Sequence, residues 1–187
     1  LVSQPRFLQA VISSAFGYAI MTFLMTGTPL SMHVMEGISL NKTSIVIQIH
    51  VACMFLPSLI AGNLVKKIGH SKMMYVGVGL YCITVIISLF DQSFLNYMIA
   101  LIFLGFGWNF LFISGTSLLV LNYKEEERFI AQGFNDFIVF SVQATASLTA
   151  GVVLSYTSWK TMNILCIPFL IIIIFTILRA DRSYKKI

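Results

Sequence analysis

The chain has 187 residues, of which 58% are hydrophobic and 10% charged, and it carries a net charge of +5. A soluble domain carries about 25% charged residues, so this composition, with a mean hydropathy of +0.90, excludes an ordinary water-soluble domain. The basic charge also fails to indicate nucleic-acid binding, because its distribution along the chain follows membrane topology, as shown below.

Six apolar segments are each long enough to cross a bilayer as a helix, which takes about 20 residues. They cover approximately residues 7–32, 43–64, 73–90, 95–121, 129–156 and 162–178. The connections between them are short, so neighbouring helices are antiparallel and no soluble domain fits between them. The sequence therefore predicts an all-α integral membrane protein with six transmembrane helices in a single domain, surrounded by the lipid bilayer.

The basic residues are strongly biased to one side of the membrane. With six spans both chain ends lie on the same side, and that side collects Arg6, Lys66, Lys67, Lys72, Lys124, Arg128, Arg179, Arg182, Lys185 and Lys186. The opposite side receives Lys42 and Lys160. This is the positive-inside bias, and it predicts that both termini of the segment lie in the cytoplasm, with the chain in the plasma (inner) membrane. Since the chain begins with Leu1, we expect further sequence to precede it.

The first predicted span carries regularly spaced polar residues. Tyr18, Thr22 and Thr26 recur every four residues and therefore share one helix face. Polar groups in hydrocarbon are costly and are typical of a helix that faces a cavity or a partner. We therefore expect Tyr18 and Thr22 to line a substrate cavity, the alternative being that the hydroxyls bond to their own helix.

His50 lies near the middle of the second predicted span, on one face with Met54 and Pro57. Histidine changes charge near physiological pH, so His50 is a candidate proton relay or ligand contact. The alternative is a neutral imidazole that hydrogen-bonds to a neighbouring helix.

The fourth predicted span contains a stripe formed by Gly105, Asn109, Phe112 and Thr116. Asn109 is adjacent to Trp108, and a polar group beside an aromatic ring suits an organic solute. Asn109 and Thr116 are therefore candidate substrate contacts. The alternative is interhelical hydrogen bonding and close packing through glycine.

The fifth predicted span places Gln132, Asp136, Gln143 and Ser147 on one face. Asp136 is the only acidic residue within a predicted span, roughly 10 Å from its start at 1.5 Å per residue. Asp136 is the first candidate for proton coupling, with Gln132 and Gln143 beside it. Alternatively, Asp136 is an acid at the start of the helix that pairs with Arg128 or with a basic residue outside this segment.

The third and sixth predicted spans are the most uniformly aliphatic, so we expect them to be peripheral and lipid-facing. The remaining phenylalanines and methionines are assigned to packing or lipid contact. Cys53, Cys82 and Cys166 fall in three separate spans, where cysteine behaves as a small hydrophobe. We find no metal-ligand spacing, phosphate-binding loop, dinucleotide fingerprint or nucleophile elbow. We therefore expect no metal, no cofactor and no enzymatic activity.

The two halves of the chain show a weak internal repeat at an offset of 88 or 89 residues. The matching pairs are Gly17 with Gly105, Gly27 with Gly115, Thr28 with Thr116, Leu30 with Leu118, Lys72 with Lys160 and Met74 with Met162, and SLIAG at 58–62 matches SLTAG at 147–151. Because each unit holds three spans, the second copy is inverted in the membrane. The sequence predicts two inverted three-helix repeats, approximately residues 1–90 and 91–187, which is a recurring plan of secondary transporters.

The segment GNLVKKIGHSK, residues 62–72, resembles the G-x-L-a-D-r-x-G-r-[RK] motif of the major facilitator superfamily. The matching positions are Gly62, Leu64, Lys67 and Gly69, with Lys72 near the final basic position. The segment ERFIAQGFNDF, which begins at Glu127 and includes Arg128, is similar to a later helix junction of the family, and Ser158 to Lys160 resembles the G-W-R that opens the last span of a half. The resemblance covers the whole chain and implies one six-helix half, the C-terminal one, that works against a second six-helix half.

One position departs from the motif. Lys66 stands where the family carries an acid that helps to latch the two halves on the cytoplasmic side, which leaves a full charge relay at this loop in doubt. The resemblance implies that Gly62, Leu64, Lys66, Lys67, Gly69, Lys72 and Arg128 form a cytoplasmic gating motif.

The resemblance and the polar residues together predict a secondary active transporter. It would move a small organic solute by alternating access, with proton coupling as a further expectation. The alternative is a non-transporting binding or assembly subunit derived from a truncated transporter of this family.

Overall fold

The computed structural model describes residues 3–184, and helices make up almost all of that range. Serine residues cap the N-termini of three helices, where Ser39, Ser93 and Ser158 each accept a hydrogen bond from a backbone N–H three residues on. The helices are α1 (Pro5–Pro29), the π-helix η1 (Leu30–Met35), α2 (Leu40–Phe55), α3 (Ser58–Ile68), α4 (His70–Ser88), α5 (Phe94–Val120), the 3-10 helix η2 (Glu125–Glu127), α6 (Arg128–Tyr156), α7 (Trp159–Leu165) and α8 (Ile167–Tyr184).

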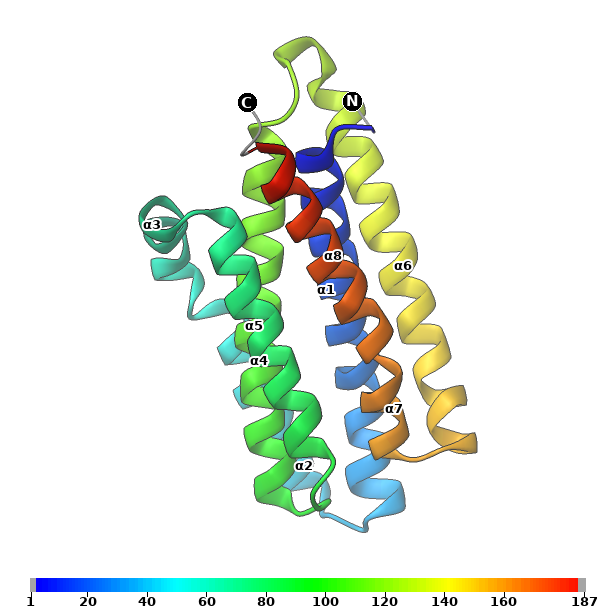
Figure 1. Cartoon of the computed structure of the whole chain (residues 1–187). Coiled ribbons are helices and arrows are strands. Elements are labelled where there is room, and N and C mark those ends of the chain that lie inside the picture. The colour runs from blue at the N-terminus through cyan, green and yellow to red at the C-terminus, as the bar shows by residue number, and fades with distance from the viewer. Residues whose placement is uncertain (1–2, 185–187) are drawn as a thin grey trace.

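Helices α1 and α5 form the centre of an antiparallel bundle. They pack on each other, α2 and α4 pack on α5, and α6 and α8 pack on α1. Figure 1 shows α4 and α8 in front of this central pair, with the start of α1, the end of α8 and the α5–α6 connection at one end of the bundle. This placement follows from an even number of spans joined by short connections.

The core depends on glycines at two helix crossings. Gly77 of α4 and Gly107 of α5 face each other, because a Cβ added to either residue would lie within 3.1 Å of the other's carbonyl oxygen. Gly115 of α5 lies against the Ala10 carbonyl and Ser14 of α1. Residues without side chains let helix backbones approach closely, which is how membrane helices gain packing energy.

The second predicted span is not one continuous helix. It divides at Leu56 and Pro57 into α2 and α3, which are bent by 42°. Proline lacks the N–H that would bond to the carbonyl four residues earlier, so it breaks or kinks a helix at this position. Figure 1 shows that α3 projects from the side of the bundle. The expected loop at residues 65–72 is correspondingly reduced to a junction at Gly69, whose φ of 85° requires glycine.

The remaining spans extend beyond their predicted bounds at several ends. Five helical stretches are long and apolar enough to cross a membrane, and the bent α2–α3 pair makes six. The all-α fold class with six spans is therefore confirmed for the described residues. The predicted repeat units stay a prediction, and Lys185 and Lys186 lie outside the described residues.

The peripheral position of the third and sixth spans is only partly matched by the structure. In the fifth span, which contains α6, 17% of the apolar stretch is buried inside the bundle. The corresponding share is 44% for α4 and 33% for the span formed by α7 and α8. Helix α6 is the least covered because it packs almost entirely on α1. Its buried positions are Ala131, Asn135, Val139, Ala150 and Leu154.

Candidate substrate site

The first and fourth spans pack on each other at the centre of the bundle, where Tyr18 meets the aromatic residues of the fourth span. The Tyr18 ring packs edge-on against Trp108, with ring centroids 5.3 Å apart, and against Phe112 at 5.4 Å. Thr22 lies one turn further along α1 and is buried. The Thr116 hydroxyl donates to the Phe112 carbonyl of its own helix at 2.8 Å. Tyr18 therefore joins an aromatic cluster. The Thr116 hydroxyl bonds within its own helix, which is neither the substrate contact nor the interhelical bond considered for it.

Asn109 is directed at the break in the second span. Its Nδ2 donates to the Met54 carbonyl and to Ser58 Oγ, both at 2.7 Å. Because the helix is interrupted at Pro57, carbonyls next to the break lose helical donors and must find others. Asn109 supplies such a donor. Its side chain therefore makes an interhelical hydrogen bond, which is the alternative to the substrate contact expected from the sequence. The sequence could not indicate this direction, since it depends on how α2 and α5 pack.

His50 is fully buried between α2 and α5. Its Nδ1 lies 2.8 Å from the Leu101 carbonyl oxygen. A carbonyl oxygen only accepts, so Nδ1 carries the proton and donates, and a neutral ring leaves Nε2 as an acceptor. This hydrogen bond to α5 agrees with the alternative interpretation, in which His50 is neutral and bonds to a neighbouring helix. The structure does not bring His50 and Asp136 together in any described hydrogen bond.

The predicted polar face of α6 is mostly uncovered. Gln132 Nε2 donates to Tyr123 Oη at 2.8 Å, and Gln143 is half-buried. Asp136 is exposed and accepts from Asn135 Nδ2 at 3.1 Å. Arg128, one of the two partners considered for Asp136, instead pairs with Glu125 at 3.3 Å.

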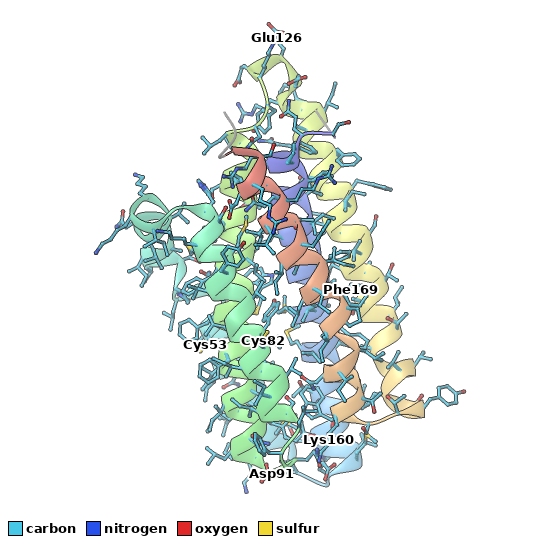
Figure 2. All side chains as sticks on the ribbon, in the orientation of Figure 1. Cys53, Cys82, Asp91, Glu126, Lys160 and Phe169 are labelled. Atoms are coloured by element: carbon cyan, nitrogen blue, oxygen red, sulfur yellow. The ribbon has the colours of Figure 1, made fainter. Side chains whose placement is uncertain are left out.

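The residues of the gating motif occupy three elements. Gly62, Leu64, Lys66 and Lys67 belong to α3, Gly69 is the junction, and Lys72 lies in the first turn of α4. Arg128 begins α6. Both Lys66 and Lys67 are exposed. Figure 2 shows Glu126 at one end of the bundle and Lys160 at the other.

The sequence analysis missed a polar cluster at the end of the bundle that holds the start of α1. Arg6 Nη1 donates to Asp181 Oδ1 at 3.1 Å, to Ser71 Oγ at 2.8 Å and to Gln9 Oε1 at 2.8 Å. Ser71 Oγ also donates to Asp181 at 2.7 Å. The cluster ties together α1, α4 and α8. A signal was present, since Arg6 and Asp181 flank the first and last spans on the same predicted side, but Asp181 fell beyond the predicted end of the sixth span.

Apart from aliphatic groups, the side chains gathered on α1 and α5 are mainly aromatic rings, amides and hydroxyls. Within residues 3–184, no three His, Cys, Asp or Glu side chains are grouped so that they could hold a metal ion. Aromatic rings, amides and hydroxyls dominate, and these groups recognise a neutral or weakly polar organic molecule by stacking and hydrogen bonding.

The comparison with protein families agrees with this architecture. The sequence profile of the Major Facilitator Superfamily matches residues 9–187. The chain therefore belongs to the major facilitator superfamily, and it is a multi-pass membrane protein.

Three curated proteins are similar to this chain in sequence. The chain is 38% identical over 174 residues to the riboflavin transporter RfnT of Brucella anthropi, a match that covers 93% of this chain and 44% of that protein. It is 33% and 31% identical over 148 residues to YddS and YdeG of Bacillus subtilis, both described as uncharacterized MFS-type transporters. Those matches each cover 78% of this chain and 34% of the relative. The chain thus spans less than half the length of the relatives it matches.

Proposed function

We propose that this chain is one half of a secondary active transporter for a small organic solute. The observation that carries the proposal is the family match over residues 9–187, together with the aromatic and polar side chains gathered on α1 and α5. The function needs no chemical step on the solute, so we propose no enzymatic activity. A non-transporting subunit has no specific observation in its favour.

The second half is part of the proposal. The length of the relatives supports it, because the matched region is less than half of each. The surface of α6 supports it too, since large apolar side chains such as Phe137, 70% exposed, and Leu148, 80% exposed, lie on it. A large exposed apolar surface indicates a contact with protein or lipid. In this proposal α6 borders the second half, and the two halves rock against each other.

The first candidate solute is riboflavin. The name of the Brucella anthropi relative supports this choice, and so does the aromatic cluster around Tyr18, because a flat ring system stacks on aromatic side chains. The orientation is part of the proposal: both termini of the segment face the cytoplasm, in the inner membrane, as the positive-inside bias predicts.

Asp136 is the proposed proton-coupling group. It is an acidic side chain on α6, and its exposed position supports contact with the second half or with the solute pathway. The Asn135 amide donates a hydrogen bond to the Asp136 carboxylate, so a neighbouring side chain on the same helix also contacts the proposed coupling group. Gln132 and Gln143 on the same helix are proposed as neighbouring polar contacts.

The test is uptake of radiolabelled riboflavin by vesicles that contain the natural full-length protein, with and without an imposed proton gradient. We expect uptake above that of empty vesicles, with stimulation by the gradient that is lost in Asp136→Asn. The matched control is Glu126→Gln, an exposed carboxylate in η2, which should keep the stimulation. Gradient-independent uptake in both the wild type and Asp136→Asn would overturn the coupling role, and no uptake at all would overturn riboflavin as the solute.

A further inference from the structure

A row of aromatic rings crosses the bundle from α2 to α6. Phe55 of α2 lies 5.8 Å from Trp108 of α5, Trp108 lies 5.3 Å from Tyr18 of α1, and Tyr18 lies 6.5 Å from Phe140 of α6, between ring centroids. Phe112 of α5 stacks on Trp108 at 5.1 Å with an interplanar angle of 10°. Four helices therefore contribute to one continuous aromatic surface.

All members of the row lie at a similar depth. Tyr18 is close to the middle of α1, Trp108 to the middle of α5 and Phe140 to the middle of α6. Phe55 lies at the break that divides the second span near its centre. In secondary transporters, substrate sites lie near the bilayer midplane, and this row occupies that level.

Exposure along the row is graded. Trp108 is 5% exposed, whereas Phe55 and Phe140 at its two ends are 58% and 56% exposed. Tyr18 and Phe112 are half-buried. The centre of the row at Trp108 is therefore buried, whereas the rings of Phe55 and Phe140 at its two ends are exposed.

Two buried polar atoms at the row have no hydrogen-bond partner among the described residues. They are Trp108 Nε1 and Thr22 Oγ1, and Thr22 lies one helical turn from Tyr18. The indole N–H is only a donor, and buried donors in proteins are almost always paired. Trp108 Nε1 is therefore a buried donor whose acceptor is not found among residues 3–184, and it is available to an acceptor that a bound molecule brings.

We propose that this row is a stacking subsite for a flat heteroaromatic ring that carries carbonyl or ring-nitrogen acceptors, with Trp108 Nε1 donating to one of them. The inference rests on the proposed transport function and names its substrate class. Ring faces bind flat π systems, and the unpaired indole N–H selects those that bear an acceptor. A quaternary ammonium ion also favours aromatic surroundings, but it offers no acceptor to Trp108 Nε1.

The test measures flavin binding to the purified full-length protein by quenching of flavin fluorescence. The probes are riboflavin and lumichrome, which keeps the flat ring and lacks the ribityl chain, with ribitol and choline as competitors. We expect both flavins to bind and neither competitor to displace them. Trp108→Leu should weaken the binding of both flavins at least tenfold, and Trp108→Phe, which keeps a ring and removes the N–H, should weaken it about threefold to tenfold.

The control is Trp159→Phe, the same change at the other tryptophan of the chain. Trp159 is buried in α7 and packs on Tyr97 at 5.2 Å, so its replacement should leave flavin affinity unchanged. Thermal unfolding of each variant separates lost binding from lost folding.

The outcomes separate this inference from the transport proposal. Riboflavin uptake that is unchanged in Trp108→Leu and Trp108→Phe would overturn the stacking subsite and leave transport standing. Displacement of flavin by choline would overturn it in favour of a cation site. Trp108-dependent lumichrome binding without riboflavin uptake would support the subsite and contradict riboflavin as the transported solute.

Discussion

Asn109 on α5 donates a hydrogen bond of 2.7 Å to the Met54 carbonyl at the break between α2 and α3. The bond satisfies a backbone group that the interrupted helix leaves without a helical donor, and both residues are buried. Asn109 therefore connects the bend of the second span to the central helix that carries Trp108.

Replacing Asn109 by alanine should destabilise the protein. The change leaves a buried carbonyl without a donor, which costs about 1–3 kcal/mol in free energy of unfolding. The measurement is unfolding of the full-length protein in detergent. Asn122→Ala is the matched control, because Asn122 Nδ2 bonds to the Leu118 carbonyl of the preceding turn in a part-buried position. Equal losses in the two variants would contradict the role assigned to Asn109.

Gly107→Ala should destabilise the α4–α5 crossing. A Cβ at this position would lie 2.6 Å from the Tyr81 ring and 3.1 Å from the Gly77 carbonyl. Overpacking of this kind costs about 1–3 kcal/mol, measurable as a lower midpoint of thermal unfolding. Gly133→Ala in α6 provides the control, since nothing lies within 4 Å of the added Cβ, and it should be neutral or stabilising. A Gly107→Ala variant as stable as Gly133→Ala would show that the helices are not in close contact here.

Asp181→Asn should weaken the connection between α1, α4 and α8. The Arg6–Asp181 pair has side-chain exposures of 25% and 31% and shares hydrogen bonds with Ser71, so we expect a loss of about 1 kcal/mol in unfolding free energy. The Arg128–Glu125 pair is exposed at 50% and 84%, and Glu125→Gln should leave stability nearly unchanged. Matching behaviour of the two variants, including the same dependence on salt, would argue against a structural role for the Asp181 cluster.

Lys124 and Lys160 lie at opposite ends of the bundle and test the orientation. In a variant without its native cysteines, Lys160→Cys should react with a membrane-impermeant thiol reagent added to intact cells, and Lys124→Cys should not. The reason is the excess of basic residues on the Lys124 side. The reverse labelling pattern would contradict cytoplasmic termini.

The fold was largely predictable from the sequence, because apolar length and charge bias are local properties. The number of spans follows from these alone. The break at Pro57 was less predictable, since proline is tolerated in many membrane helices when neighbours supply the missing donors. The position of α6 at the edge was also hidden, because its polar residues resemble those of a cavity-lining helix and its burial depends on what else is present.

The site was predictable in part. The spacing of Tyr18 and Thr22 and the tryptophan next to Asn109 pointed to α1 and α5, the two helices that pack at the centre of the bundle. The direction of Asn109 toward Met54, and the convergence of Phe55 and Phe140 on Trp108, depend on tertiary packing. Phenylalanines carry no local signal that separates a ligand contact from a lipid contact, which is why the sequence assigns these two to packing or lipid contact.

Entrance counterflow tests the central claim most directly. Vesicles that contain the natural full-length protein are loaded with unlabelled riboflavin and diluted into a trace of labelled riboflavin without any ion gradient. A carrier that alternates between two sides predicts a transient accumulation of label above its equilibrium level, reduced in Trp108→Leu and retained in Trp159→Phe. Monotonic equilibration of the label, at the rate of empty vesicles or of a simple pore, would contradict the account.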